Sequence, residues 1–166
     1  MSETVSVWAA HVITVSDGVY HGVRQDDSGD LLAGILVGEG FEPVGRTLVA
    51  DEPAQIKTAI VDACQTAQLV LSTGGTGFGP RDVTPEATLE VVERAAPGIV
   101  HLMLTAGVES TPMAALSRPV AGAIGRSLVI NLPGSPRGAS ENLNAILPVV
   151  PHALRLLGGD TEHRSG

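Results

Sequence analysis

The chain has 166 residues, of which 43% are hydrophobic, and it carries a net charge of −8. This length and apolar content suit one compact core, so we expect residues 1–166 to form a single domain. The acidic balance, with one lysine and nine arginines spread along the sequence, excludes nucleic acid as an expected partner, because nucleic-acid surfaces need a basic patch. The few aromatic residues offer no platform for stacking unpaired bases.

The single cysteine, Cys64, has no partner for an internal disulfide. It falls at helical spacing with Ile56, Ala59 and Ile60, which predicts a small core residue rather than a nucleophile. The sequence has no membrane-length apolar run and no apolar targeting segment near its start. We therefore expect a cytoplasmic location and no membrane partner.

Strand-like and helical patterns alternate along the sequence. In chain order we expect a strand at 5–15, a helix at 28–39, a strand at 41–49, a helix at 53–67, a strand at 69–71, a helix from Thr84, a helix at 99–108, a short segment from 111, a strand at 127–132 and a helical stretch at 140–157. Pro148 and Pro151 predict a kink or two shorter helices in that last stretch. The alternation indicates the α/β class, with a mostly parallel sheet and helices on both faces.

Ligands of such sheets bind outside the carboxyl ends of the strands, so the segments that follow the strands should face one crevice. These segments carry polar groups and glycines: Ser16 and Asp17, then Asp51 and Glu52, then 74–82, and finally 131–135. The sequence therefore predicts one site built by four loops.

The third of these segments is the most informative, because a short apolar strand there runs into four glycines, an isolated aspartate and a helix start, as LVLSTGGTGFGPRDVTPEAT at 69–88. Glycines allow positive φ and close approach to a ligand. Amides in such a loop, together with the unpaired donors of the next helix, can converge on an anion. We therefore interpret the loop as a phosphate cradle.

Two familiar phosphate motifs do not fit this loop. A P-loop would need Lys followed by Ser or Thr where the chain has Pro80 and Arg81. A dinucleotide fingerprint would need a third glycine at position 80. A glycine run alone is also compatible with a tight turn that binds nothing, and Asp82 is what favours function.

Two aspartates are candidates for chemistry. Thr84 is already a good N-cap for the next helix, so that helix does not need Asp82, and a functional role is favoured. Asp51 also has an ordinary interpretation as a carboxylate at a helix N-terminus, worth roughly 0.3–1 kcal/mol. An acidic protein that binds a phosphate ester must offset repulsion, which implies Mg²⁺ held by one or two carboxylates and the phosphates.

Other polar residues give weaker signals. The five histidines show no metal-ligand spacing, which argues against a zinc site or a histidine base. Arg81 suits a phosphate contact or a polar surface turn equally well, and Arg118 lies too far along the chain to be placed. The acidic cluster before the first long helix, formed by Asp26, Asp27 and Asp30, is interpreted as a solvated capping region.

Taken together, the segments at 14–17, 51–52, 72–88, 116–118 and 132–136 resemble the MogA/MoaB family of molybdenum cofactor biosynthesis, which includes the gephyrin G domain. The resemblance runs from about Val12 to Gly158, and the long central motif is its most specific part. It implies a three-layer α/β/α sandwich and a homotrimer. It also implies transfer of AMP from ATP to the terminal phosphate of molybdopterin, with Mg²⁺ and release of pyrophosphate, before a MoeA-type protein inserts the metal.

The resemblance further implies roles for individual residues. Asp51 and Asp82 match the family's two important aspartates, so we expect them to be catalytic and to hold the metal. The expected pocket residues are Ser16, Asp17, Thr73, Gly74, Gly75, Thr76, Gly77, Asn131, Pro133, Gly134 and Ser135. Small departures occur at Asp30, where relatives often have proline, and at Arg137, where lysine is common.

Two alternatives stay open beside the enzyme. Some MoaB-type relatives keep the fold and much of the motif with doubtful catalysis, so this chain is alternatively a non-catalytic pterin-binding paralogue. A generic nucleotide-binding module outside the pathway is the third interpretation. The presence of both aspartates favours the enzyme.

Overall fold

A computed structural model describes residues 7–161 of the chain. The first residues of the strand expected at 5–15, and the ends of the single domain expected over 1–166, lie outside the described residues. No helix within 7–161 is long and apolar enough to cross a membrane.

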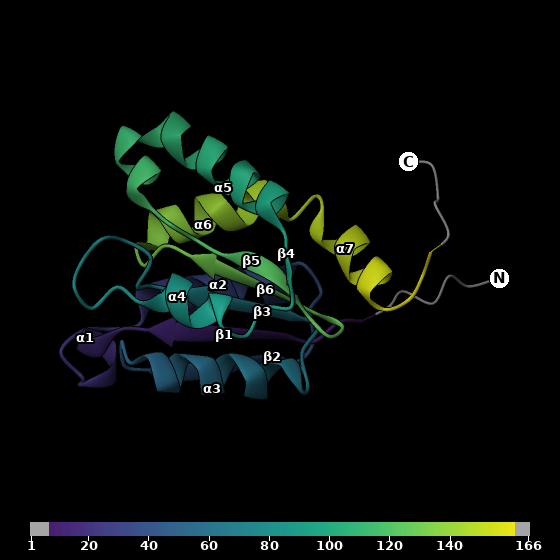
Figure 1. Ribbon diagram of the computed structural model, residues 1–166, viewed down its shortest axis with the longest axis horizontal. Helices are drawn as coiled ribbons and strands as arrows, with labels where there is room; N and C mark the ends of the chain where they lie inside the picture. Colours follow the sequence, from purple (N-terminus) through teal and green to yellow (C-terminus); the bar gives the residue numbers. More distant parts are fainter. Residues whose placement is uncertain (1–6, 162–166) are drawn as a thin grey trace.

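The centre of the molecule is a six-stranded sheet (Figure 1). From edge to edge the strands run β2 (Val44–Val49), β1 (Ala10–Val15), β3 (Leu69–Thr73), β6 (Ser127–Leu132), β5 (Ala121–Ile124) and β4 (Arg94–Ala95). The first four are mutually parallel, whereas β5 and β4 are added antiparallel, so the expectation of a mostly parallel sheet is confirmed.

Helices cover both faces of the sheet and give three layers (Figure 1). One face packs against α3 (Pro53–Cys64) and α4 (Thr84–Leu89). The other face packs against α2 (Asp27–Gly38), α5 (Pro97–Ser110), α6 (Pro136–Ile146) and α7 (Val150–Leu157). Successive strand residues alternate between these two cores, as Val12 and Ile13 do in β1. The expected α/β/α sandwich is confirmed.

The expected helical stretch at 140–157 is two helices, as its prolines predicted. Pro151 lies in the first turn of α7, where a missing amide proton costs little. The first helix, α6, begins earlier than expected, at Pro136, because Ser135 caps it by accepting a hydrogen bond from the Gly138 amide. The short elements α1 (Asp17–Tyr20) and η1 (Pro112–Leu116) complete the fold.

The strand order fixes where a ligand should bind. The chain leaves β1 for β2 on one side and then returns to place β3 on the other side of β1. The connections after β1 and β3 therefore diverge at the carboxyl ends of these strands and leave a crevice between them. Ser16 follows β1 at this edge and Gly74 follows β3.

Candidate functional site

A cavity of about 630 Å³ lies at the carboxyl ends of the parallel strands. It is lined by segments that follow four of them, together with the residues that lead into α2. The expected residues that line it are Ser16, Asp17, Asp51, Thr73, Gly74, Gly75, Asp82, Gly134 and Ser135.

A second, smaller cavity of about 310 Å³ adjoins the first, and Ser135 lines both. It lies among α5, η1 and α6, and its walls are mainly apolar, with side chains such as Met103 and Met113. The remaining expected loop residues, Thr76, Gly77 and Pro133, face this second cavity rather than the first. The glycine loop therefore contributes to both spaces.

The structure places Asn131 in neither cavity. Its side chain is fully buried, where its amide donates to the hydroxyls of Ser72 and Thr88, at 2.9 and 3.0 Å, and its carbonyl accepts from the Val120 amide at 3.0 Å. An amide with all of these partners serves to join the sheet to α4. The expectation that Asn131 lines the pocket is corrected, because its side chain is buried against α4 and is absent from the walls of both cavities.

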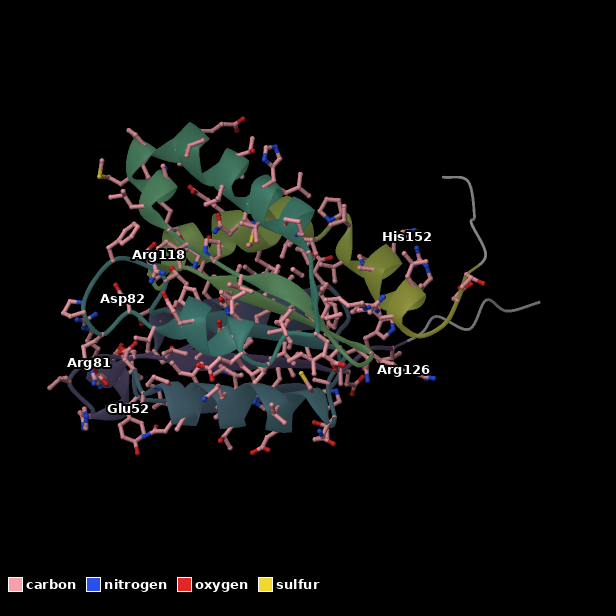
Figure 2. The ribbon with its side chains drawn as sticks, in the orientation of Figure 1. Glu52, Arg81, Asp82, Arg118, Arg126 and His152 are labelled. Carbon is pink, nitrogen blue, oxygen red and sulfur yellow. The ribbon has the colours of Figure 1, made fainter. Side chains whose placement is uncertain are left out.

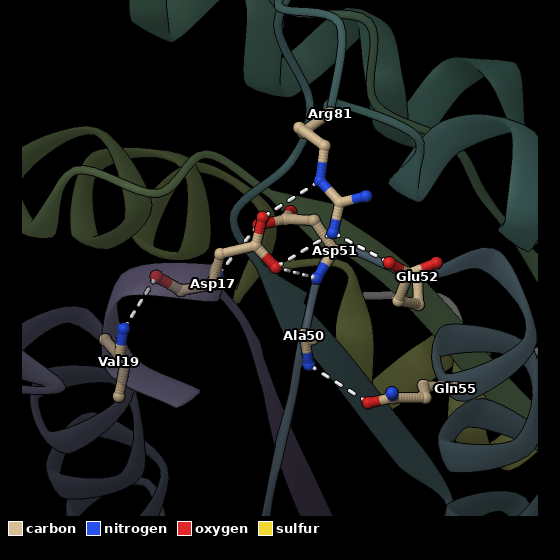
Figure 3. Close-up of polar contacts among 8 residues, drawn as sticks. Asp17, Val19, Ala50, Asp51, Glu52, Gln55 and Arg81 are labelled. Carbon is tan, nitrogen blue, oxygen red and sulfur yellow. Dashed lines mark hydrogen bonds and ion pairs between the residues drawn. The ribbon is translucent and has the colours of Figure 1, made fainter. Parts of the chain in front are cut away.

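Asp17 and Asp51 are linked by a reciprocal pair of hydrogen bonds (Figure 3). The Asp17 amide donates to Asp51 Oδ2 at 2.9 Å, and the Asp51 amide donates to Asp17 Oδ1 at 3.0 Å. Arg81 then reaches over from the glycine loop and binds the Asp17 carboxylate with two nitrogens, at 3.0 and 3.1 Å, and Glu52 at 2.8 Å. Three loops are therefore tied together, and Arg81 is engaged with carboxylates.

The surroundings of this link shift the pKa values of the two aspartates in opposite directions. The hydrogen bond from Arg81 holds the pKa of Asp17 below its usual value. Burial raises the pKa of Asp51; the Asp17 amide opposes that rise, while the carboxylates of Asp17 and Asp82 add to it. A nearby cation would therefore oppose this rise and stabilise the ionised form of Asp51.

Asp82 folds back on its own loop, where Oδ2 accepts a hydrogen bond from the Gly79 amide at 2.8 Å. The expected N-cap, Thr84, is not the cap: Val83 holds that position, and the Thr84 hydroxyl donates to the Gly74 carbonyl at 2.9 Å. Thr84 is buried and joins the two ends of the loop, which is a long-range role that spacing does not reveal.

Arg118, which could not be placed from the sequence, binds backbone carbonyls of the glycine loop. Two of its nitrogens donate to the Gly77 carbonyl, at 2.9 and 2.8 Å, and one also reaches the Asp82 carbonyl at 3.2 Å. It also pairs with Glu86 and lies over the Phe78 ring. Figure 2 shows Arg118, Asp82, Arg81 and Glu52 at one end of the molecule.

The two candidate metal carboxylates come from different loops but line the same cavity. Each has one oxygen bonded to an amide, while Oδ1 of Asp51 and Oδ1 of Asp82 accept no hydrogen bond from the described residues. No group of three or more histidine, cysteine, aspartate or glutamate side chains suited to a metal occurs within 7–161. Two carboxylates with free oxygens fit Mg²⁺, which usually takes one or two protein carboxylates and completes its shell with water and substrate phosphates.

Several lining residues were not expected. Arg24 and Gln25, in the connection between α1 and α2, line the first cavity, as do Asp26 and Ser28. Asp26 is more than a solvated cap, because it accepts from the Thr14 hydroxyl and forms an ion pair with Arg46 at 2.6 Å. These residues line the cavity because the start of α2 lies next to the end of β1. That proximity depends on the fold, so the sequence alone does not predict it.

Residues 11–152 match a family model described as a probable molybdopterin binding domain. The chain belongs to this family.

Individual relatives agree. A molybdopterin adenylyltransferase from Helicobacter pylori is 38% identical over 153 residues, which are 90% of this chain and 87% of that protein. A molybdenum cofactor biosynthesis bifunctional protein from Synechococcus elongatus is 44% identical over 151 residues, 90% of this chain but 47% of that protein. This chain spans less than half the length of several curated relatives that it matches, 22% in the case of a Dictyostelium discoideum gephyrin.

The fold is shared with solved members of the family. The crystal structure of the molybdopterin biosynthesis enzyme MoaB from Thermus thermophilus superposes with a TM-score of 0.85 at 48% identity, covering 92% of this chain and 98% of that one. The family resemblance expected from the sequence is thereby confirmed.

Proposed function

We propose that the protein transfers the adenylyl group of ATP to the terminal phosphate of molybdopterin and releases pyrophosphate. Membership of the molybdopterin-binding family supports a place in molybdenum cofactor biosynthesis. The observation that carries the specific reaction is the approach of Asp51 and Asp82, from two different loops, to one cavity beside the glycine loop. Relatives named molybdopterin adenylyltransferase align with nine-tenths of the chain.

The reaction needs positioning more than acid–base catalysis. A phosphate oxygen of molybdopterin attacks the α-phosphorus of ATP, one P–O bond forms, and the bond to the β-phosphate breaks. Because the attacking oxygen is already anionic, no side chain has to remove a proton. Two adjoining cavities that share Ser135 suit a reaction of two substrates held side by side.

In this proposal Asp51 and Asp82 hold Mg²⁺. The ion would neutralise charge between the phosphate groups of the two substrates. Amides of the glycine loop would stabilise charge that develops on the transferred phosphoryl oxygens, and the network of Asp17 and Arg81 would keep Asp51 in place.

The test is adenylyl transfer by Asp82→Asn, measured as adenylyl-molybdopterin formed from molybdopterin and ATP over a range of Mg²⁺ concentrations. We expect the rate to fall at least about a hundredfold and the Mg²⁺ requirement to rise. Asp62→Asn, which makes the same change at an exposed position of α3, should match the wild type. Unchanged activity of Asp82→Asn would remove Asp82 from the mechanism.

The same assay separates the other interpretations. A wild-type protein that binds molybdopterin and ATP but forms no adenylylated product would be a MoaB-type binding paralogue. Tight ATP binding with no response to molybdopterin would indicate a generic nucleotide module.

We further propose that residues 1–166 act as one domain in the cytoplasm and associate as a homotrimer. A MoeA-type molybdenum-insertion protein would then receive the product. The family resemblance supports these points, and α5, with Leu102 and Val108 exposed, offers an apolar surface for association. Light scattering of the purified protein would measure the assembly.

A further inference from the structure

The first cavity has an acidic wall that is poorly suited to phosphate. Its lining includes five aspartates: Asp17, Asp26, Asp27, Asp51 and Asp82. Arg24 is the one basic side chain among its lining residues. A polyphosphate or phosphate ester that enters this space meets repulsion from the carboxylates, and Arg24 is the lining side chain whose own charge attracts it.

The side chain of Arg24 is also free to take a ligand. Within residues 7–161 its guanidinium makes no hydrogen bond or ion pair. The arginines nearest to the functional loops are occupied: Arg46 pairs with Asp26, Arg81 with Asp17, and Arg118 with Glu86. An arginine that lines an acidic cavity without binding any of its carboxylates has five donors available for an anion.

The backbone fixes the position from which Arg24 acts. The Gly18 carbonyl accepts hydrogen bonds from the amides of both Val23 and Arg24, at 2.8 and 3.1 Å. The chain therefore leaves β1, makes the single turn of α1, and closes back on itself before α2 begins. This closure returns Arg24 to the cavity wall beside Gly18.

The side chain of Arg24 packs against Gly18. A Cβ atom at position 18 would lie 3.1 Å from Nε of Arg24 and 3.3 Å from its Cδ, closer than side chains normally approach. Gly18 lines the cavity as well, and because glycine has no side chain, the Arg24 side chain can lie directly against its backbone. A larger residue at position 18 would push the guanidinium away from its present place.

We propose that Arg24 binds a phosphate group of a substrate and supplies the cationic contact of the first cavity. The inference rests on the proposed function for the identity of the ligand, since ATP and molybdopterin both carry phosphate. Arg24 is a binding residue in this proposal: it recognises the anion and does not take part in bond making.

The test is calorimetric titration of the whole chain with MgATP, with molybdopterin and with adenosine. We expect Arg24→Gln to weaken binding of MgATP, of molybdopterin, or of both by at least about tenfold, as the loss of a charged hydrogen bond predicts. Adenosine has no phosphate, so its affinity should not change. Whichever phosphate ligand loses affinity is the one that Arg24 contacts.

Arg126→Gln is the matched control. Arg126 also forms no ion pair within the described residues, but it lies in the turn between β5 and β6, at the opposite end of the molecule from Arg81 and Asp82 (Figure 2). This variant removes the same charge and should bind all three ligands as the wild type does. Gly18→Ala, which keeps the charge but crowds the arginine, should give a smaller loss than Arg24→Gln in the same direction.

Wild-type affinity of Arg24→Gln for both phosphate ligands would overturn the inference. An equal loss in Arg126→Gln would overturn it too, because the effect would then be one of net charge. Failure of the proposed function would give a different result, because the wild type would then bind both phosphate ligands but form no adenylyl-molybdopterin. The affinities of the wild type and Arg24→Gln for these ligands would still decide the role of Arg24.

Discussion

Asp17 and Asp51 each donate a backbone amide to the carboxylate of the other, at 2.9 and 3.0 Å (Figure 3). They follow the adjacent parallel strands β1 and β2, so the two hydrogen bonds join the loops at the edge of the sheet where the cavity lies. Asp17 also anchors Arg81. Asp17 lines the cavity, and its carboxylate also positions Asp51 by accepting the hydrogen bond from the Asp51 amide.

The first prediction tests that link. Asp17→Ala removes the acceptor of the Asp51 amide and the anchor of Arg81, and we expect kcat for adenylyl transfer to fall about tenfold to a hundredfold because Asp51 is misplaced. Asp17→Asn keeps an oxygen that can accept from the Asp51 amide, so its loss should be smaller. In urea, the alanine variant should show a lower free energy of unfolding than the wild type. Equal, wild-type kcat values in both variants would contradict a positioning role.

The second prediction concerns the start of the glycine loop. Gly74 has a φ of 106°, and a Cβ there would overlap the carbonyl oxygen of Val15. Gly40 has a similar φ of 91° but faces open space. Gly74→Ala should therefore add an overlap of about 1–3 kcal/mol to the strain that both variants share, which is itself about 1–2 kcal/mol.

Urea unfolding of the two variants measures this difference. Gly40→Ala reports the cost of the left-handed backbone alone, and the excess in Gly74→Ala reports the close approach of the loop to β1. Equal free energies of unfolding would mean that the loop moves away from Val15 without cost.

The sequence predicted the sheet edge and the glycine loop because both depend on local patterns. Short apolar runs bounded by turn residues give β1, β3 and β6, and the prolines divide the last helical stretch into α6 and α7. The two antiparallel strands were missed for the same reason: β4 has two residues and β5 reads AGAI, so neither shows a period of its own.

The contacts that shape the site were harder to predict because they join residues far apart in the chain. Spacing alone does not place Arg118, which donates to the Gly77 carbonyl, 41 positions away. Arg81 was compatible with a phosphate contact, but the structure engages it with Asp17 and Glu52. The segment at 131–135 predicts Asn131 in the pocket, whereas the side chain of Asn131 points from β6 into the protein core. Pairings of this kind follow from topology and strand register, which composition and spacing do not contain.

The last prediction uses a histidine away from the site. His11 lies in β1 opposite Gly45, and its Nε2 is 2.6 Å from the Thr47 hydroxyl. Burial lowers its pKa from the usual 6.5, because the folded protein favours the neutral ring. As the pH falls below about 6.5, the unfolded chain takes up a proton at His11 before the folded protein does, so the free energy of unfolding decreases.

His11→Gln removes this titration while keeping a polar side chain. Urea unfolding at about pH 7.5 and about pH 5.5 should therefore show a smaller loss of stability for His11→Gln than for the wild type, since the carboxylates contribute equally to both. His152→Gln, at an exposed position on α7 (Figure 2), is the matched control and should lose as much stability as the wild type. If His11→Gln also loses as much, burial of the imidazole does not couple folding to protonation in this pH range.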